Sequence, residues 1–342
     1  MKTAVIILNW NGAEMMRKFL PSVVANTPEA DVIVADNGST DNSLEVLRSE
    51  FPSVGIIQLD KNYGFAEGYN RAIAQVDHEY IVLLNSDIET PVQWLSPLET
   101  FMDSNPDVAA CQPKLLSYIN KEMFEYAGAS GGYIDRFGYP YCRGRIFGIV
   151  EADKGQYDDT ADIHWATGAC MMVRRSIYTT LGGLDARFFA HNEEIDLCWR
   201  MRLAGHRICC IPQSHVYHLG GGTLPQGNPR KTYLNFRNNL TMLYKNLPEQ
   251  QLKSVMRWRT LLDYVAMAQS AAKFCFGDVS AIIRARRDFH AWQRDYLPIR
   301  KEIQATAQKA GTADTTLLSP FSILWKFYVQ GKKHFSELRV KS

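Results

Sequence analysis

The chain has 342 residues, of which 46% are hydrophobic and 11% aromatic, enough apolar side chains for a large buried core. This composition excludes a wholly disordered chain. No apolar run reaches the roughly 20 residues that a membrane-spanning helix needs. The apolar run at residues 4–8 is also too short for a signal peptide.

The net charge of +2 conceals an asymmetry along the chain. Residues 251–342 contain 16 Lys and Arg against 7 Asp and Glu, whereas residues 1–250 contain 22 against 29. An acidic body with a basic tail predicts a metal site in the body and contact between the tail and an anionic surface. The seven cysteines include no CxxC pair, and Cys209 and Cys210 are adjacent, which favours a reduced, cytoplasmic compartment.

The first hundred residues alternate short β-rich runs with helical patterns. Strands are predicted at residues 4–8, 32–35, 54–59 and 80–84, and helices at about 14–25, 41–50 and 66–75. This order predicts a parallel, doubly wound sheet with the C-terminal ends of its strands at one edge. Ligands bind at that edge in open α/β sheets.

Polar residues follow each of these predicted strands. They are Asn9-Trp10-Asn11-Gly12 after the first, Asp36-Asn37-Gly38-Ser39-Thr40-Asp41 after the second, Asn62-Tyr63-Gly64-Phe65-Ala66 after the third and Asn85-Ser86-Asp87 after the fourth. Four such loops at the same edge predict a binding site. No GxGxxG follows the first strand, which argues against a dinucleotide site.

Beyond residue 107 the pattern changes. Residues 108–175 contain short β-like runs with many Gly and Tyr, which predict a mixed sheet with hairpins. A helix is expected at 192–204, closed by Gly205, followed by a strand at 208–211 and a glycine-rich loop at 215–223. From about Tyr233 the pattern is helical, with interruptions expected at Pro248, Gly277 and Pro298.

Two carboxylates at the strand ends suggest nucleotide and metal binding. Asp36 can accept the imide N–H of a uracil or thymine ring, or instead shape the turn before the helix near Asp41. Mg²⁺ and Mn²⁺ prefer carboxylate and amide oxygens and leave positions open for phosphate. Asp87 can hold such an ion against a pyrophosphate. The alternative for Asn85-Ser86-Asp87 is a solvated loop before Pro91.

Three carboxylates, those of Glu193, Glu194 and Asp196, fall in the first turn of the helix expected at 192–204. Sugar transfer with inversion needs a carboxylate that removes the proton of the acceptor hydroxyl, and general-base help contributes about 10²–10⁴ in rate. Acidic residues also favour helix N-termini through the helix dipole, which accounts for one or two of the three. The flanking apolar pairs indicate a packed turn, which favours a catalytic role.

His215 and His218 precede Gly220, Gly221, Gly222 and Thr223, whose N–H groups can approach phosphate oxygens closely. A single histidine is more often structural than a metal ligand. Of the two, His218 is the better candidate ligand.

These motifs, in this order, resemble the family-2 inverting glycosyltransferases of GT-A fold, particularly the bacterial rhamnosyltransferase-like branch. The resemblance covers about residues 3–245. Besides the loops above, its carriers are Ile7-Leu8, Glu67-Gly68-Tyr69-Asn70, Leu84, Thr167-Gly168-Ala169-Cys170-Met171-Met172-Val173-Arg174-Arg175, the run at 193–200 and His218-Leu219-Gly220-Gly221.

The resemblance implies a role for each matching residue. Asp87 stands at the last position of a DxD-type metal motif whose first Asp is Asn85 here, and His218 would complete the coordination of the metal. The family has Glu-Asp where this chain has Glu193-Glu194, so Glu194 is the expected base, with Glu193 and Asp196 as alternatives. Asp36 would contact the pyrimidine, the nucleotide side would also include Asn9, Asn11, Asn62, Gly64, Asn70, Asn85 and Asp87, and the acceptor side would include Trp165, Gly168 and Ala169.

The predicted fold is therefore α/β of the GT-A type, with a Rossmann-like, doubly wound, mostly parallel sheet and a C-terminal helical extension. The catalytic domain would span residues 1–245, with a nucleotide-binding half at about 1–105 and an acceptor half at about 106–245, and residues 246–342 would form the basic extension. The predicted reaction moves a sugar, with inversion and with Mg²⁺ or Mn²⁺, from a UDP- or dTDP-sugar to a saccharide or lipid-linked saccharide. Family likeness suggests dTDP-rhamnose as the donor and cell-surface polysaccharide as the product.

Two other functions stay open. A sugar nucleotidyltransferase would need a Gly/Arg-rich phosphate loop after the first strand, and Asn9-Trp10-Asn11-Gly12 is not one. A catalytically silent subunit that binds carbohydrate or nucleotide sugar would not need the acidic cluster.

The tail mixes aromatic residues with Lys and Arg. One interpretation is an accessory helical bundle packed on the catalytic domain. The other is peripheral attachment to anionic lipid at the cytoplasmic face of the inner membrane, where a lipid-linked acceptor would lie. No nucleic-acid partner is expected. The aromatic residues are Trp258, Tyr264, Phe274, Phe276, Trp292, Trp325, Phe327 and Tyr328.

Overall fold

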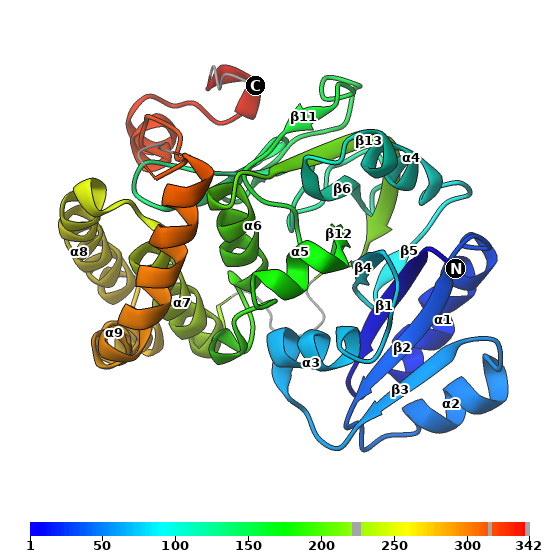
Figure 1. Ribbon diagram of the computed structural model, residues 1–342. Coiled ribbons are helices and arrows are strands. Elements are labelled where there is room, and N and C mark those ends of the chain that lie inside the picture. Colours follow the sequence, from blue (N-terminus) through cyan, green and yellow to red (C-terminus); the bar gives the residue numbers. More distant parts are fainter. Residues whose placement is uncertain (221–226, 314–316, 339–342) are drawn as a thin grey trace.

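The computed structural model of the protein describes residues 1–220, 227–313 and 317–338. At its centre is a nine-stranded sheet with the order β11-β13-β6-β12-β4-β1-β2-β3, and β5 pairs with β13 (Figure 1). The strands are β1 (Thr3–Asn9), β2 (Asp31–Asn37), β3 (Gly55–Leu59), β4 (Tyr80–Leu84), β5 (Ile88–Glu89), β6 (Val108–Ser117), β11 (Ala161–Asp162), β12 (Cys170–Arg174) and β13 (Arg207–His218).

The first half of this sheet is parallel, because β1 pairs in parallel with both β2 and β4, and β2 pairs in parallel with β3. The doubly wound sheet predicted from the first hundred residues is therefore confirmed. Along β1, Val5 and Ile7 enter one hydrophobic cluster and Ala4 and Ile6 the other, as the two-residue period of a strand requires. The second half is mixed, since β12 runs antiparallel between β4 and β6.

Helices cover both faces of the sheet (Figure 1). On α1 the buried residues Met16, Leu20 and Val23 recur at helical spacing and so form one apolar stripe against the sheet. One face carries α1 (Ala13–Ala25), α2 (Ser43–Glu50) and α4 (Ser96–Ser104); the other carries α3 (Gly64–Ile73), α5 (Arg175–Thr180) and α6 (Glu193–Leu203).

A second, antiparallel sheet accounts for the hairpins expected after residue 107. Its order is β10 (Ile149–Val150), β9 (Arg145–Ile146), β8 (Pro140–Cys142) and β7 (Gly132–Ile134). The end of the chain returns to this sheet. Ser319 N–H donates to the Ile134 carbonyl, Ile323 N–H to Asp135 Oδ2 and Phe335 N–H to Glu151 Oε1, each at 2.8 Å.

The strand predicted at 208–211 is longer than expected. β13 continues to His218 after a register shift between Ile211 and His215, so the first residues of the predicted glycine-rich loop are strand. Pairing with β6 supplies backbone partners that the local sequence does not reveal. Gly221, Gly222 and Thr223 lie outside the described residues.

The C-terminal extension is helical and belongs to the main core. It contains α8 (Glu249–Ala272), α9 (Phe276–Ala310), a short π-helix η2 (Trp325–Val329) and a 3-10 turn η3 (Phe335–Glu337), and it follows α7 (Pro229–Asn246). Its residues Val255, Tyr296 and Ile303 belong to the same hydrophobic cluster as Ile6. Packing on the catalytic part is therefore what the structure shows, while the boundary at 245/246 stays a prediction.

The three expected interruptions of the helical region have different outcomes. Pro248 is the N-cap of α8, so the chain turns there as predicted. The break before α9 falls at residues 273–275, and Gly277 already lies in the first turn of α9. The interruption expected at Pro298 is wrong, because α9 runs through it. Pro298 is exposed, so water can reach the carbonyl that loses its hydrogen bond.

Candidate active site

Asn9 at the end of β1 and Asp36 near the end of β2 lie side by side. The register pairs them directly, and Asn9 Nδ2 donates to Asp36 Oδ1 at 3.2 Å. The other oxygen of Asp36 accepts from the Ser39 N–H at 3.1 Å, which is the turn-shaping bond considered above. Asp36 is 1% exposed at the strand end. Its contact with a pyrimidine stays a prediction.

Asn11 joins the first two strand-end loops. Its Oδ1 accepts from the N–H of Thr40 at 2.7 Å, and its own N–H donates to Ser39 Oγ at 2.9 Å. Its φ of 51° lies in the left-handed region, which asparagine tolerates better than most residues. The amide of Asn11 therefore fixes one loop against the other, and its contact with a nucleotide stays a prediction.

Asn62 and Gly64 in the third loop are held by Asn37, which carried no predicted role of its own. Asn37 Nδ2 donates to Asn62 Oδ1 at 3.2 Å and to the Gly64 carbonyl at 3.0 Å. Gly64 has a φ of 80°, and a Cβ added there would lie 2.5 Å from Cδ2 of Phe189. Only glycine allows this conformation and this close approach. Gly64 is therefore a joint between the two halves of the site.

Asn70 does not fit the nucleotide contact predicted for it. Its Nδ2 donates to the Leu184 carbonyl at 2.8 Å, and its Oδ1 accepts from the Leu184 N–H at 3.0 Å and the Tyr178 hydroxyl at 2.6 Å. Both ends of the amide are thus engaged in tying α3 to the loop after α5. Asn70 positions the backbone, and the sequence motif alone did not separate this role from ligand binding.

Asp87 and His218 meet because β5 pairs antiparallel with the end of β13, with His218 opposite Ile88. Nε2 of His218 lies 3.1 Å from Asp87 Oδ1 and 3.4 Å from Asn85 Nδ2. Asp87 Oδ2 accepts from the Gly220 N–H at 3.1 Å. The structure therefore brings together the two side chains predicted to bind a metal, from positions 131 residues apart.

The charges of this pair depend on each other. Burial favours the neutral forms of both groups, but the hydrogen bond from His218 lowers the pKa of Asp87. Burial would likewise lower the pKa of His218, yet the carboxylates of Asp87 and Glu125 raise it to about 10. Nδ1 of His218 lies 3.1 Å from Glu125 Oε2, an ion-pair distance without hydrogen-bond alignment. Glu125 was not singled out in the sequence.

Asp87 and His218 fit a divalent cation that takes its remaining ligands from elsewhere. Adjacent ligands of an octahedral ion at about 2.1 Å lie about 3 Å apart, and Oδ1 of Asp87 is 3.1 Å from Nε2 of His218. Across the described ranges, no group of three or more His, Cys, Asp and Glu side chains has the geometry of a metal site. Two protein ligands with phosphate and water are nevertheless typical of Mg²⁺ bound with a nucleotide.

Gly168 and Ala169 connect the ends of β4 and β12 to α6. The Asn85 N–H donates to the Ala169 carbonyl at 2.9 Å. A Cβ added at Gly168 would lie 3.1 Å from Cζ of Phe65 and 3.7 Å from Cβ of Glu194. The two residues therefore lie between Asn85 and Glu194, and their place on the acceptor side stays a prediction.

Glu193 and Glu194 are held where ionisation is difficult. Burial raises the pKa of Glu194 to about 7, although hydrogen bonds from backbone groups including Gly168 act in the opposite direction. Burial together with the charge of Glu194 also raises the pKa of Glu193 well above its usual value. The Oε2 atoms of both residues are buried and have no hydrogen-bond partner among the described residues. A carboxylate with a pKa near 7 is suited to act as a general base at neutral pH.

Asp196 is not available as a base. Its side chain is fully buried and accepts from Arg200 Nε, Lys245 Nζ and Asn246 Nδ2, each at 2.9 Å. Burial would raise the pKa of Asp196, but the charges of Lys245 and Arg200 lower it. The prediction of Asp196 as an alternative base is therefore wrong, since both oxygens are used to join α6 to α7. The base candidates reduce to Glu193 and Glu194.

The loop before Glu193 has an unusual backbone held by a residue that sequence reasoning missed. Phe189, His191 and Asn192 have φ values of 65°, 72° and 69°, a conformation that non-glycine residues rarely adopt. Asn238 of α7 donates to three carbonyls of this loop: Phe188 at 3.0 Å, Ala190 at 2.9 Å and His191 at 2.8 Å. One buried amide thus fixes the loop that carries the two glutamates. No local motif marks Asn238.

Trp165 does not fit the acceptor contact predicted for it. Its side chain is 4% exposed, and its Nε1 donates to the Tyr133 carbonyl at 3.0 Å. The ring covers Gly132 so closely that a Cβ there would lie 2.0 Å from Cε2 of Trp165. The indole therefore joins the second sheet to the core and offers no free face for a sugar.

The strand order places the remaining candidates along one edge. Asn9, Asp36 and Asn85 follow three neighbouring strands, and strands about 4.8 Å apart bring such residues within about 10 Å. Asn85 then contacts both His218 and Ala169, and Gly168 contacts Glu194. Asp87, His218 and Glu194 are thus linked through Asn85, Ala169 and Gly168, whereas Asp36 is bonded to Asn9 on the neighbouring strands. Convergence of all four side chains on one ligand stays a prediction.

The chain is similar to two rhamnosyltransferases and to a protein of O-antigen biosynthesis. The N-acetylglucosaminyl-diphospho-decaprenol L-rhamnosyltransferase of Mycobacterium tuberculosis is 27% identical over 238 residues, which are 63% of this chain and 75% of that protein. The rhamnosyltransferase WbbL of Escherichia coli is 26% identical over 63% of this chain and 82% of its own length. The O-antigen biosynthesis protein RfbC of Myxococcus xanthus is 26% identical over 64% of this chain, but the match spans only 17% of RfbC.

Solved structures show the same fold. TarS 1-349 of S. aureus in complex with UDP-GlcNAc has a TM-score of 0.57 at 14% identity, covering 92% of this chain and 88% of that one. GalNAc-T7 with UDP, GalNAc and Mn²⁺ has a TM-score of 0.60 at 15% identity, covering 89% and 57%. The predicted GT-A architecture with C-terminal helices is therefore confirmed. The sequence model of the family "Glycosyl transferase family 2" matches residues 4–182, which are more than half of the chain. The protein therefore belongs to that family.

Proposed function

We propose that this protein transfers a sugar, with inversion, from a UDP- or dTDP-sugar to a hydroxyl of a saccharide or lipid-linked saccharide in cell-surface polysaccharide synthesis. The observation that carries the proposal is the pair of buried Glu193 and half-buried Glu194 beside Gly168, joined through Ala169 and Asn85 to Asp87. Names of relatives that act in rhamnose transfer and O-antigen biosynthesis support this class of acceptor. By the same likeness we propose dTDP-rhamnose as the donor.

Glu194 is the proposed base. With its pKa raised by burial to about 7, it is both partly ionised and strongly basic at neutral pH. In a single displacement, Glu194 accepts the proton of the acceptor hydroxyl while the acceptor oxygen forms its bond to the anomeric carbon. The bond between that carbon and the nucleotide diphosphate breaks, and the diphosphate leaves with its electrons. The backbone of Gly168 holds the carboxylate in place.

Asp87 and His218 are the proposed holders of Mg²⁺ or Mn²⁺, which would neutralise charge on the departing diphosphate when bound. Binding through Nε2 of His218 requires loss of the proton that this ring otherwise carries, since its pKa is raised to about 10 by the neighbouring carboxylates. Asp36 and the amides of Asn9 and Asn62 line the proposed nucleotide side. The structures of TarS and GalNAc-T7, solved with UDP-GlcNAc and with UDP and Mn²⁺, support this class of ligands.

Donor turnover tests the proposal. Nucleotide sugars are first screened by thermal shift with and without Mn²⁺, because a ligand bound only by the folded state raises stability in proportion to RT ln(1 + [L]/Kd). The donor that stabilises the protein should then release its nucleoside diphosphate slowly without acceptor. The Asp87→Ala substitution should abolish both the stabilisation that depends on Mn²⁺ and the release of nucleoside diphosphate that depends on Mn²⁺. A protein that binds the donor but never releases diphosphate with any saccharide acceptor would instead be the silent binding subunit.

We also propose peripheral contact of α8 with anionic lipid. Four large apolar side chains of this helix are at least half exposed: Trp258, Leu261, Tyr264 and Val265. Lys253, Arg257, Trp258 and Leu261 line one shallow cavity on the same helix, so basic and apolar groups share a face. No helix within the described residues is long and apolar enough to cross a membrane.

Vesicle co-sedimentation tests this contact. Wild-type protein should sediment with phosphatidylglycerol vesicles, and Trp258→Glu with Leu261→Glu should release it. The control is Val92→Glu, which changes an exposed apolar residue outside α8. Equal sedimentation of all three proteins would remove this part of the proposal.

A further inference from the structure

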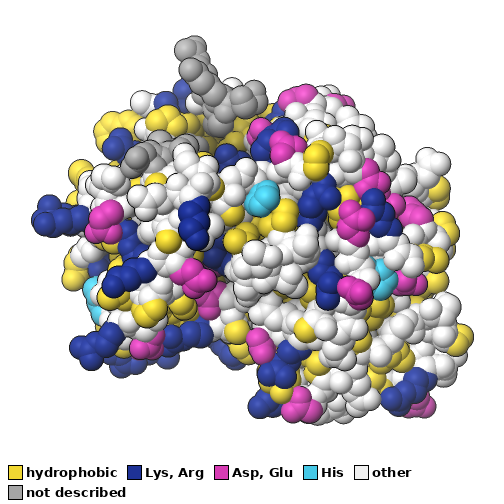
Figure 2. All heavy atoms as spheres, in the orientation of Figure 1, with side chains coloured by type: hydrophobic (Ala, Val, Ile, Leu, Met, Phe, Trp, Pro, Cys, Tyr) yellow, Lys and Arg dark blue, Asp and Glu magenta, His cyan; other side chains and the backbone are white. Residues whose placement is uncertain are grey.

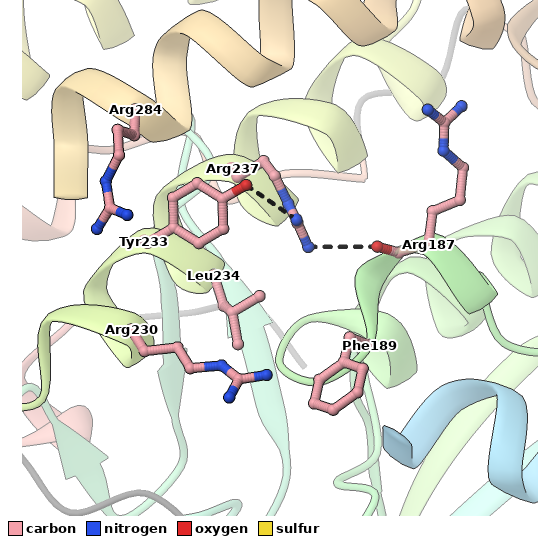
Figure 3. A pocket seen from close by; sticks show the side chains of 7 residues that line it. All are labelled: Arg187, Phe189, Arg230, Tyr233, Leu234, Arg237 and Arg284. Atoms are coloured by element: carbon pink, nitrogen blue, oxygen red, sulfur yellow. Dashed lines mark hydrogen bonds between the residues drawn. The ribbon is translucent and has the colours of Figure 1, made fainter. Parts of the chain in front are cut away.

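A cavity of about 510 Å³ lies beside the loop that precedes Glu193. It is within the usual size of small-molecule sites, roughly 300–1,000 Å³. Figure 3 shows that its walls come from three segments: α7, α9 and the 3-10 turn η1 (Ala186–Phe188) with the residue that follows it. The lining residues are Arg187, Phe189, Arg230, Tyr233, Leu234, Arg237 and Arg284.

The lining carries four guanidinium groups and no carboxylate. Arg187 is paired with Asp295 at 3.2 Å, and its guanidinium points away from the other three in Figure 3. For Arg230, Arg237 and Arg284, no ion pair to a carboxylate is found within residues 1–220, 227–313 and 317–338. Basic side chains also gather over the lower left of the face in Figure 2, where α7 and α9 lie. The residues that line the cavity therefore carry an excess of positive charge.

Arg237 is the strongest sign of a missing anion. It is 7% exposed, and a buried guanidinium without a carboxylate is costly unless another charge offsets it. Its partners are all neutral: Tyr233 OH at 3.1 Å, Asn238 Oδ1 at 2.9 Å and the carbonyls of Arg187 and Phe188. These bonds fix the fork of Arg237 in place, and the carboxylate of Asp288 reaches it only indirectly, through the Tyr233 hydroxyl, which donates to Asp288 Oδ2 at 2.7 Å.

The helix direction adds to the same potential. The cavity lies along the first half of α7, where Arg230, Tyr233, Leu234 and Arg237 occupy one face at helical spacing. The N-terminal end of a helix carries partial positive charge and favours anions. Arg230 projects toward the ring of Phe189, with its guanidinium carbon 5.2 Å from the ring centroid (Figure 3).

The position of the cavity identifies which substrate reaches it. Phe189 separates the cavity from Gly64 and accepts from the Phe65 N–H at 2.8 Å through its carbonyl, while Glu193 and Glu194 follow a few residues later. The cavity thus lies on the side of the glutamates. None of the side chains on the proposed nucleotide side, those of Asn9, Asp36 and Asn62, lines the cavity. A ligand here accompanies the acceptor and not the donor.

We propose that this arginine cavity binds a diphosphate group carried by the acceptor, next to the sugar that is extended. The inference rests on the proposed glycosyltransferase function and specifies its acceptor as a diphosphate-linked saccharide. Three unpaired guanidinium groups match the two or three negative charges of a diphosphate, and planar guanidinium forks suit phosphate oxygens. Tyr233 and Phe189 provide aromatic surface for the adjoining apolar or sugar group.

Binding of farnesyl diphosphate in the presence of EDTA tests the proposal, because the chelator removes any metal-dependent binding at Asp87. Isothermal titration should detect binding to the full-length wild type. The double variant Arg230→Ala/Arg284→Ala should weaken it by at least about ten-fold, since each charged contact contributes strongly to phosphate recognition. Both side chains are exposed, so their removal should leave the melting temperature unchanged.

Arg294→Ala/Lys301→Ala is the matched control, because it removes the same charge from exposed positions of α9 outside the cavity. It should bind farnesyl diphosphate like the wild type. Inorganic pyrophosphate should bind with the same dependence on Arg230 and Arg284 if the diphosphate is the recognised group. Binding that is absent, or equally strong in both double variants, overturns the proposal.

A second arm separates this inference from the proposed function. UDP or dTDP with Mg²⁺, whichever the wild type binds, should bind the Arg230→Ala/Arg284→Ala variant with unchanged affinity. If this variant also lost nucleotide binding, the cavity would belong to the donor side and the inference would be overturned. Donor turnover by the wild type would still support the proposed function. Absence of donor turnover in the wild type would remove the proposed function without affecting the diphosphate titration.

Discussion

On the predicted nucleotide side, the polar residues at the strand ends bond to one another within neighbouring loops, as Asn9 does with Asp36 and Asn37 with Asn62. The turn that carries Glu193 and Glu194 is held instead from outside, by Asn238 about 50 positions later in the chain. The first region needs only the parallel sheet to form. The second needs α7 to be docked before Phe189, His191 and Asn192 can adopt their unfavourable backbone conformations.

This difference indicates that different parts of the chain hold the proposed donor-binding residues and the proposed catalytic glutamates. Side chains on rigid strand ends keep their places, because β1, β2 and β4 are each paired on both sides. The glutamates have buried oxygen atoms without partners, a state that costs free energy and persists only where the surroundings impose it. Substitutions on the two sides should therefore separate donor affinity from turnover.

The largest expected effect is that of Glu194→Gln on turnover. Removing the base should lower kcat by about 10²–10⁴, with donor affinity unchanged. In the wild type, kcat/KM should rise with pH and level off above the pKa of about 7, because the base acts only when deprotonated. Glu193→Gln is the matched control and should retain most of the activity. The reverse result, with Glu194→Gln within a few-fold of wild type, would assign the base to Glu193.

Next is Asn238→Ala, which should lower kcat by about 100-fold, since a displacement of about 1 Å in a catalytic group can cost that much. The loss of three hydrogen bonds to residues 188–191 frees the loop that carries the base. Steady-state kinetics with saturating donor and acceptor measure this effect.

Asn239→Ala separates positioning from stability. Asn239 is equally buried and donates to the Gly138 carbonyl at 2.8 Å, away from the glutamates. Each variant should lower the free energy of unfolding by about 1–3 kcal/mol. Only Asn238→Ala should reduce kcat. Equal kinetic losses in the two variants would mean that loss of stability alone explains the effect.

A smaller effect is expected at the joint between the two regions. Gly64→Ala combines a φ of 80° with a Cβ 2.5 Å from Phe189, so strain and overlap should together lower stability by about 2–5 kcal/mol. Gly182→Ala has a φ of 79° and no atom within 4 Å, so it should cost only about 1–2 kcal/mol. Chemical denaturation measures both. Equal costs would show that Phe189 moves freely and that the two sides are not tightly joined.

The smallest effect is a pH dependence of stability. A carboxyl group whose pKa is raised on folding binds its proton more tightly in the folded state, so the protein loses stability as pH rises from the unfolded value of about 4.3 towards about 7. Glu194→Gln removes this loss. The variant should therefore gain stability relative to the wild type as pH rises. The difference between their free energies of unfolding should be about 2 kcal/mol larger, in favour of the variant, at pH 8 than at pH 5.5. A difference that is independent of pH would contradict the raised pKa.

Much of the fold was predictable because local patterns specify it. The strands at 4–8, 32–35, 54–59 and 80–84 all lie within observed strands or overlap them, since parallel strands buried on both faces are continuous apolar runs. The C-terminal part of β13 was not predictable, because its pairing with β6 is a long-range contact. Pro298 shows the converse error, in which a local signal is overridden by the surrounding helix.

The candidate site was predictable where the proposed site residues lie at strand ends or in the first turn of a helix. Asp87 and His218 are brought together as expected, and Glu194 lies against Gly168. Asn70 and Trp165 were assigned to ligands although their polar groups are bonded to the backbone of distant segments. Asp196 was ambiguous for the same reason, because Lys245 and Asn246 are remote in sequence. Sequence spacing cannot show which polar groups are already occupied.

The return of the last residues to the second sheet has a consequence for how the protein matures. Ser319, Ile323 and Phe335 supply partners for Ile134, Asp135 and Glu151, positions made nearly 200 residues earlier. While the ribosome is still extending the chain, these groups and the apolar surface around them stay uncovered. Completion of the native state must therefore wait until residues 319–335 have left the ribosome, so the interval before they emerge is when this molecule is most exposed to aggregation.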